Sequence, residues 1–347
     1  MCINYKIGRC KSIMTKIDIY SGFLGAGKTT LIKKMISEAY KGQKLVLIEN
    51  EFGEIGIDGG FLQDAGINIT EMNSGCICCS LVGDFGKALT QVIAEYNPDR
   101  IIIEPSGVGK LSDVIAAVEK VTNDEVTLGY TVAVADAGKV KVYMKNFGEF
   151  YNNQIETAST IILSRTDSVP QAKLDTSVAL IREHNQVATL VTTPWGELTG
   201  EQLIAAMEGK ATLAAELARL ELERLAAEEE EHEHHHHHEH DEHCTCGCHD
   251  HEHHHHHADE VFTSWGVETP KKFSEEEIHT ILTALDGGEY GKVLRAKGIV
   301  NGESGWIEFD YVPEEHEVRA GHPDYTGRLC VIGAELHEDK LRTLFGL

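Results

Sequence analysis

The chain has 347 residues, of which 41% are hydrophobic, and a formal net charge of −25. A chain of this length is long enough for a sizeable core and for two domains. Its acidic balance argues against nucleic acid or an anionic membrane as the main partner, and no apolar run approaches the ~20 residues that cross a bilayer. Residues 1–16 lack the continuous apolar stretch of a cleaved signal, and we expect residues 1–13 to be a loose extension.

A glycine-rich loop follows the first short apolar run, at 17–20, and leads into a segment of helical character at 30–36. A strand, a GxxxxGK[ST] loop and a helix in this order form a phosphate-binding pattern. Glycines let backbone N–H groups turn toward phosphate oxygens, and the helix N-terminus adds positive potential. We expect Lys28 to reach the β and γ phosphates and Thr29 to bind Mg²⁺. The residues expected around the phosphates are Gly22, Gly25, Ala26, Gly27, Lys28, Thr29 and Thr30.

Acidic residues follow the next apolar run, at 45–48. Glu49 and Glu51 come directly after a predicted strand, which places them near the γ-phosphate, where a metal ion or the attacking water could be held. An exposed acidic strand end is the alternative interpretation.

Three cysteines then occur within four positions, as Cys76, Cys78 and Cys79. Such a cluster in a chain without a secretory signal indicates thiolate metal binding or redox chemistry more than a disulfide framework. Cys76 and Cys78 can turn inward together and hold a borderline-soft ion such as Zn²⁺. A buried turn of small residues is the alternative.

Further strand ends carry polar residues. Glu104 follows the apolar run at 101–103, where it is expected to meet Mg²⁺ through water, although a carboxylate there could also cap the next helix. Asp136, at the end of 132–135, is expected to form a turn rather than to bind a ligand.

Several stretches share their order and spacing with one protein family: 22–30, 49–54 with 56–58, 75–79 and 101–107. They resemble the CobW family of GTPases, relatives of the accessory GTPases that insert nickel into hydrogenase and urease. The resemblance covers the first half of the chain well and the last ninety residues loosely. It implies that Glu51 lies in the first switch segment, that the CxCC motif binds metal, and that Gly107 completes the ExxG motif begun by Glu104.

One motif departs from the family. Its guanine-recognition sequence, Asn-Lys-x-Asp, is replaced after the apolar run at 161–163 by Ser164, Arg165, Thr166 and Asp167. Asp167 keeps the carboxylate that would accept hydrogen bonds from N1–H and the 2-amino group of guanine. Arg165 could stack on the base, whereas Ser164 is too short to copy the asparagine. Guanine remains the expected base.

A tract at 228–260 contains twelve acidic residues, fifteen histidines, three cysteines and no lysine or arginine. It has too little apolar surface to offset chain entropy and is expected to be disordered without metal. Imidazoles, thiolates and carboxylates at this density suit the weak capture of several divalent ions. Its candidate ligands include Cys244, Cys246, Cys248 and His249. A solvated linker or an engineered tag is the alternative, but tags are terminal and uniform.

Apolar runs that alternate with helical segments predict an α/β fold, with a mostly parallel sheet and the ligand at the carboxyl ends of its strands. We expect a P-loop GTPase domain at 14–198, a helical linker with the metal-binding tract at 199–260, and a small α+β domain at 261–347. The C-terminal elements expected are strands at 261–268, 293–300, 305–312 and 328–332 and helices at 274–285 and 337–345.

The function that these observations favour is that of a cytoplasmic, GTP-hydrolysing metallochaperone. It would use GTP and Mg²⁺, carry Zn²⁺ or, as the next choice, Co²⁺, and deliver the ion to a client protein or a cofactor pathway. A dimer that depends on nucleotide or metal is compatible with this interpretation. The alternatives are a metal buffer that relies on the histidine tract and has a vestigial nucleotide site, and a redox switch through Cys76 and Cys78.

Overall fold

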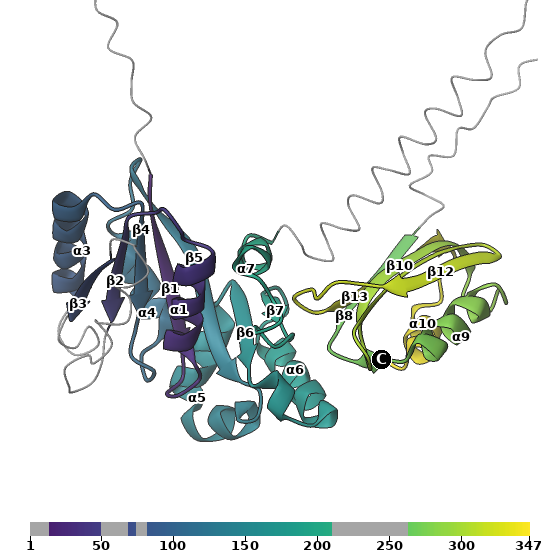
Figure 1. The fold of residues 1–347 in the computed structure, drawn as a ribbon. Coiled ribbons are helices and arrows are strands. Elements are labelled where there is room, and N and C mark those ends of the chain that lie inside the picture. The colour runs from purple at the N-terminus through teal and green to yellow at the C-terminus, as the bar shows by residue number, and fades with distance from the viewer. Residues whose placement is uncertain (1–13, 50–68, 74–81, 210–262) are drawn as a thin grey trace, which may run out of the picture. The chain divides into compact units, whose positions relative to one another are not determined.

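The computed structural model describes residues 14–49, 69–73, 82–209 and 263–347. The chain divides into two compact units, one that ends at Gly209 and one that follows it (Figure 1). Each unit has a hydrophobic core of its own. The candidate residues that lie outside the described residues are Glu51, Cys76, Cys78, Cys79, Cys244, Cys246, Cys248 and His249.

The first unit is built on a seven-stranded sheet in which every neighbouring pair is parallel. The strands in spatial order are β3 (Ile69–Asn73), β2 (Leu45–Glu49), β4 (Arg100–Glu104), β1 (Thr15–Gly22), β5 (Val126–Asp136), β6 (Thr160–Ser164) and β7 (Thr189–Val191). The helices are α1 (Lys28–Glu38), α3 (Val82–Tyr96), α4 (Leu111–Glu119), α5 (Val140–Thr157), α6 (Gln171–His184) and α7 (Gly200–Met207), with a 3₁₀ turn at Thr166–Ser168. The expected α/β fold is therefore confirmed.

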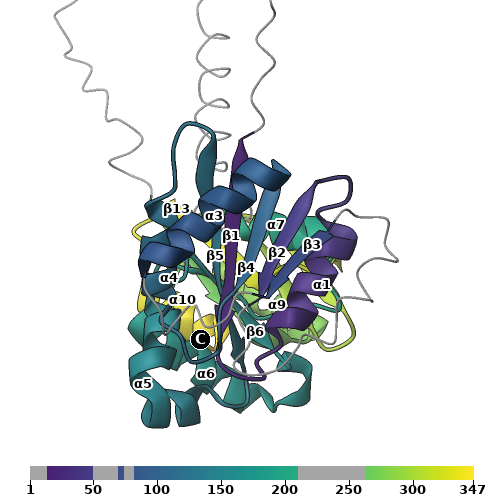
Figure 2. The same cartoon turned by 90° about the vertical axis from the view of Figure 1, so that its left-hand side faces the viewer.

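Helices cover both faces of this sheet, which is why its strands are apolar almost without interruption. Figure 2 shows α3 and α4 on one side of the sheet and α1 on the other. Along β1 the side chains alternate between the two faces. Ile17 and Ile19 enter the main core with α3, α4, α5 and α6, while Asp18 and Tyr20 point to the face that carries α1 and α7.

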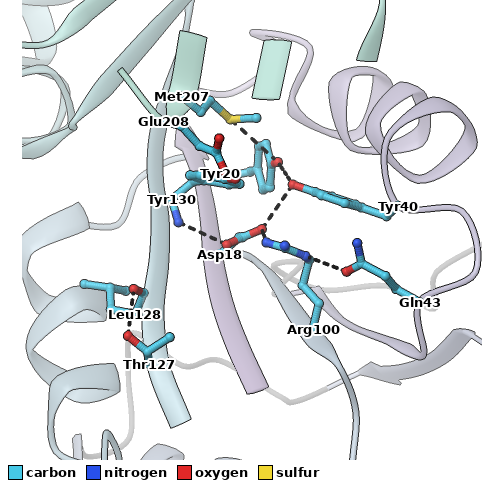
Figure 3. Close-up of polar contacts among 10 residues, drawn as sticks. All are labelled: Asp18, Tyr20, Tyr40, Gln43, Arg100, Thr127, Leu128, Tyr130, Met207 and Glu208. Atoms are coloured by element: carbon cyan, nitrogen blue, oxygen red, sulfur yellow. Dashed lines mark hydrogen bonds and ion pairs between the residues drawn. The ribbon is translucent and has the colours of Figure 1, made fainter. Parts of the chain in front are cut away.

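A polar network lies buried on that second face (Figure 3). Arg100 forms an ion pair with Asp18, which also accepts hydrogen bonds from the Tyr40 hydroxyl at 3.1 Å and the Tyr130 backbone N–H at 3.0 Å. The hydroxyls of Tyr20 and Tyr40 are 2.7 Å apart. Burial raises the pKa of the Asp18 carboxyl, and the neighbouring Arg100 charge offsets part of that rise. A buried carboxylate is tolerated here because its oxygens are hydrogen-bonded and its charge is paired.

Helix α7 belongs to the first unit, although the sequence analysis assigned its residues to the linker. Thr199 and Gln202 form a capping box at its start, and Leu203 is fully buried. At its end, the Tyr20 hydroxyl contacts the Met207 sulfur at 3.9 Å, and the Tyr130 hydroxyl donates to Glu208 at 3.1 Å (Figure 3). The helix is thus attached to strands β1 and β5.

The described residues of the second unit, 263–347, form a six-stranded sheet with two helices. Its strands are β8 (Thr263–Thr269), β9 (Lys272–Phe273), β10 (Lys292–Gly302), β11 (Trp306–Val312), β12 (Glu315–Ala320) and β13 (Gly327–Ala334), and its helices are α9 (Glu275–Leu285) and α10 (Glu338–Phe345). The main path runs β12-β11-β10-β13-β8 and is antiparallel, while β9 pairs with β10 in parallel. Ser274 caps α9 by accepting from the Glu277 N–H at 3.0 Å, as expected. The α+β class is confirmed, but β12 was not expected, nor was β3 of the first unit.

Among the described residues, none of the helices combines the length and the apolar character that crossing a membrane requires.

Candidate nucleotide-binding site

The loop between β1 and α1 has the backbone geometry of a phosphate cradle. Gly22 has φ 145°, and a β-carbon there would lie only 2.3 Å from the carbonyl oxygen of Val134. Gly27 has φ 102° and precedes the first residue of α1, which carries no acidic residue in its first turn. Both positions require glycine, and the uncompensated helix N-terminus is available to an anion.

The two polar residues after the loop point to different partners. Lys28 is buried, with 8% of its surface exposed, and its ammonium lies 3.5 Å from the carbonyl oxygen of Phe23 within the loop. The Thr29 hydroxyl donates to both carboxylate oxygens of Glu104, at 3.0 and 3.1 Å. Hydroxyl and carboxylate oxygens are the ligand types that Mg²⁺ prefers, either directly or through water. The chain therefore has a donor set that fits this ion beside the phosphate loop.

Three neighbouring strands end in register beside these residues. Glu49 at the end of β2 pairs with Glu104 at the end of β4 on one side and with Asn73 at the end of β3 on the other. The carboxyl ends of parallel strands form the ligand-binding edge of such sheets. Glu49 consequently lies one strand away from the Thr29–Glu104 contact, along the same edge.

A pocket of about 720 Å³ opens over the loop, within the ~300–1,000 Å³ typical of small-molecule sites. Gly107 forms part of its wall, and a β-carbon on that glycine would approach the Leu24 backbone nitrogen to 2.6 Å. The pocket is lined by Leu24, Gly25, Gly27, Lys28, Thr29, Thr30, Glu104, Pro105, Ser106, Gly107, Val108 and Arg165. The structure thus brings eight of the expected phosphate, magnesium and base residues to one cavity: Gly25, Gly27, Lys28, Thr29, Thr30, Glu104, Gly107 and Arg165. Ala26 lies within the loop and is buried.

The segment that replaces the guanine-recognition motif has a defined geometry. Arg165 adopts a left-handed backbone conformation, φ 57°, directly after β6. Its guanidinium binds the Asp136 carboxylate at 2.5 Å and donates to the Gly25 carbonyl oxygen at 3.0 Å. Asp136 also accepts from the Gly138 N–H at 2.9 Å, so it forms the expected turn and in addition anchors the arginine.

The other two residues of this segment differ in exposure. The Ser164 side chain is buried, with its hydroxyl 3.5 Å from the Ala135 carbonyl oxygen. Asp167 is exposed and accepts a hydrogen bond from the Ser168 hydroxyl at 3.1 Å. Arg165 therefore contacts the phosphate loop, whereas the Asp167 carboxylate faces solvent, where a base could meet it.

Trp195, in the loop after β7, is a site residue that the sequence analysis did not find. A β-carbon built on Gly27 would lie 3.0 Å from its indole ring and 3.9 Å from the Ser164 side chain. The indole thus packs beside the phosphate loop and next to β6. Because 168 residues separate Gly27 from Trp195, no local pattern could reveal this contact.

The phosphate loop, the buried Lys28 and the contact between Thr29 and Glu104 together define a P-loop nucleotide-binding protein. The family model described as "CobW/HypB/UreG, nucleotide-binding domain" matches residues 16–192, just over half of the chain, and the cobalamin synthesis protein cobW C-terminal domain matches residues 262–346. The chain belongs to the CobW/HypB/UreG family. This membership confirms the expected enzyme class, GTPase, together with the resemblance noted in the sequence.

Three curated relatives illustrate the similarity. The zinc chaperone CobW of Sinorhizobium sp. is 30% identical over 61% of this chain and 68% of its own length. The zinc chaperone YjiA of Escherichia coli (strain K12) is 31% identical over 50% of this chain and 57% of its own. The zinc-regulated GTPase metalloprotein activator 1 of Schizosaccharomyces pombe is 28% identical over 52% and 46%. The chain thus spans about half the length of the latter two.

Proposed function

We propose that this chain is a GTP-hydrolysing metallochaperone that carries Zn²⁺, with Co²⁺ as the second choice, and passes it to a client protein or cofactor pathway. The names of the relatives, zinc chaperones and a zinc-regulated GTPase metalloprotein activator, support zinc. The proposed metal ligands are Cys76, Cys78, Cys79 and Glu49.

The observation that carries the proposal is the register of the three strand ends. Glu104 contacts Thr29 beside the phosphate loop, and Glu49 and Asn73 continue the same edge on the next two strands. Cys76 follows Asn73 by three residues, so chain length alone limits its distance from that strand end to roughly 11 Å. A thiolate site there would lie close enough to the nucleotide for each ligand to influence the other.

In this proposal each residue has a defined role. Lys28 stabilises negative charge on the β and γ phosphates, and Thr29 with Glu104 holds Mg²⁺, which neutralises charge between those phosphates when bound. Glu51 orients the attacking water in the switch segment. Asp167 selects guanine, and Arg165 stays on the phosphate loop through Gly25.

The tract at 228–260 is proposed to collect metal ions, with Cys244, Cys246, Cys248 and His249 among its ligands. A cytoplasmic location suits a protein that needs free thiolates, because the reducing cytosol keeps them from oxidation. A dimer that forms with nucleotide or metal is compatible with this scheme.

Thermodynamic linkage between GTP binding and zinc binding provides the test of this proposal. If GTP assembles the thiolate site, GTP must strengthen zinc binding, and zinc must strengthen GTP binding by the same factor. A coupling free energy of ~1–3 kcal/mol corresponds to a change in zinc affinity of roughly 5- to 150-fold. Zinc affinity is measured by competition with a chromophoric chelator in the GTP, GDP and nucleotide-free states. GTP with Mg²⁺ should produce the shift and GDP should not. Equal affinities in all three states would refute the metallochaperone mechanism.

A deletion separates this proposal from a metal buffer. Removing residues 228–260 should lower the number of zinc ions bound per chain and leave one tight, nucleotide-sensitive site. Serine at Cys78 and Cys79 should have the opposite effect. Loss of the tight site on deletion of the tract would favour the buffer.

A further inference from the structure

Two histidines meet on the surface of the second unit, far from each other in sequence. Nδ1 of His279 lies 3.1 Å from Nε2 of His316, and the ring centroids are 5.3 Å apart. His279 is exposed on α9 and His316 is half-buried on β12. The two facing nitrogens are open to solvent on a part of the chain for which no role has been given so far.

The spacing of these nitrogens fits a shared metal ion. With metal–nitrogen bonds of ~2.0–2.1 Å, two imidazole nitrogens on one ion lie roughly 2.8 Å apart in octahedral and 3.4 Å apart in tetrahedral geometry. The observed 3.1 Å falls between these limits. The two nitrogens therefore already lie at a separation that a shared ion requires, and rotation of the rings would turn both toward it.

The backbone that carries the pair is firmly held. Ser274 caps the start of α9, whose residues Ile278 and Leu282 are fully buried in the core of the unit. On the other element, His316 stands opposite Tyr311 in the β11–β12 ladder. Ligands on rigid elements lose little conformational entropy on binding an ion, which favours affinity.

The surroundings favour a cation. Asp286 accepts hydrogen bonds from the Tyr311 hydroxyl at 2.7 Å and from the Glu314 N–H at 2.9 Å, which places its carboxylate beside the β11–β12 turn that leads into His316. Glu275 and Glu276 precede His279 by one helical turn. A net negative field around the two imidazoles attracts a divalent ion.

We propose that His279 and His316 form a two-histidine binding site for a borderline divalent ion, Zn²⁺, Ni²⁺, Cu²⁺ or Co²⁺, with water completing the coordination. Imidazole suits these ions and not the oxygen-seeking Mg²⁺ and Ca²⁺. In the present contact, one of the two facing nitrogens carries a hydrogen. When a metal ion binds, that nitrogen loses its hydrogen to solvent, and the other nitrogen of the same ring takes up a proton. No group of three or more candidate ligands occurs within the described residues, so the site depends on this pair. It goes beyond the proposed function because it involves neither nucleotide nor the CxCC motif.

Residue-resolved histidine labelling tests the site in the full chain. Diethylpyrocarbonate acylates free imidazole nitrogens, and peptide mass spectrometry locates each modified histidine. Saturating Zn²⁺ or Ni²⁺ should abolish labelling of both His279 and His316, while Mg²⁺ should not. His322 and His337, exposed on the same unit, serve as internal controls whose labelling should stay unchanged.

Variants show whether the two side chains act together. In His279→Gln, labelling of His316 should persist in the presence of Zn²⁺, because one imidazole alone holds the ion weakly, and His316→Gln should free His279 in the same way. Hydrogen exchange of α9 checks that each variant is folded. The proposal fails if zinc protects neither histidine, if His316 stays protected in His279→Gln, or if removing residues 228–260 abolishes protection of the intact pair.

Discussion

The Thr29 hydroxyl donates to both carboxylate oxygens of Glu104, 75 residues further along the chain. Thr29 lies in the first turn of helix α1 and Glu104 ends β4, so the contact joins the phosphate loop to the neighbouring strand. Through Glu104, the loop is connected to the strand ends that precede the switch segment and the CxCC motif.

Replacing the hydroxyl should reveal its role as a magnesium ligand. Thr29→Ala is expected to make GTP hydrolysis slow and nearly independent of Mg²⁺, because the direct protein ligand is lost. Thr29→Ser keeps the oxygen and should retain the magnesium response. Phosphate release is measured against Mg²⁺ concentration, and a normal response in Thr29→Ala would contradict the assignment.

Lys28 should be indispensable for turnover. Its ammonium is buried beside the loop carbonyl of Phe23, and removing one such electrostatic stabiliser costs about 10²–10³ in kcat. Lys28→Ala should therefore abolish measurable hydrolysis. Lys34→Ala removes the same charge further along α1, where the lysine pairs with Glu38, and should leave turnover intact. Full activity in Lys28→Ala would mean that the phosphate loop is wrongly assigned.

Guanine selection is expected to depend on Asp167. A hydrogen bond to a charged group contributes ~1.5–3 kcal/mol, so Asp167→Ala should weaken GTP binding by roughly 10- to 150-fold and leave ATP binding unchanged. Asp175→Ala, an exposed carboxylate on α6, is the matched control. Affinities for both nucleotides are measured by calorimetry. Equal affinity of the unmodified protein for ATP and GTP would exclude Asp167 as the base-selecting residue.

Trp195 should report nucleotide binding. Its indole packs against Gly27, so phosphates entering the loop alter the surroundings of the ring. GTP should change the tryptophan emission, and Trp195→Phe should remove that change. Trp265 and Trp306 lie in the second unit and remain in that variant as a constant background. A nucleotide-dependent signal that survives in Trp195→Phe would place its origin in the second unit.

Breaking the buried ion pair in Figure 3 should destabilise the first unit. Arg100→Met leaves the Asp18 carboxylate without its counter-charge, and breaking a buried ion pair in this way costs ~3–5 kcal/mol. Hydrogen exchange of peptides from β1 and β5 measures the loss. Lys110→Met removes an exposed ion pair with Glu149 on the same unit and should have little effect. Unchanged protection of β1 in Arg100→Met would show that the network contributes little.

The sequence predicted those parts of the site that are contiguous in the chain. The phosphate loop was found because its residues occupy adjacent positions, and α9 because Ser274 and Glu277 mark its start. Contacts between distant segments were not predicted: Arg165 meets Asp136, and His279 meets His316, only because sheet order and helix packing bring them together. Strand β12 was missed because it lies at a sheet edge and carries mainly polar side chains, which resemble a loop in sequence.

The attachment of α7 to β1 and β5 ties the end of this helix to two strands of the sheet that carries the nucleotide site. Met207 and Glu208 are contacted by the hydroxyls of Tyr20 and Tyr130. Tyr20 is two residues from Gly22, where the phosphate loop begins. A displacement of the end of α7 would therefore act first on a tyrosine of the strand that leads into the nucleotide site, so a change at this helix has a short mechanical route to the phosphate loop.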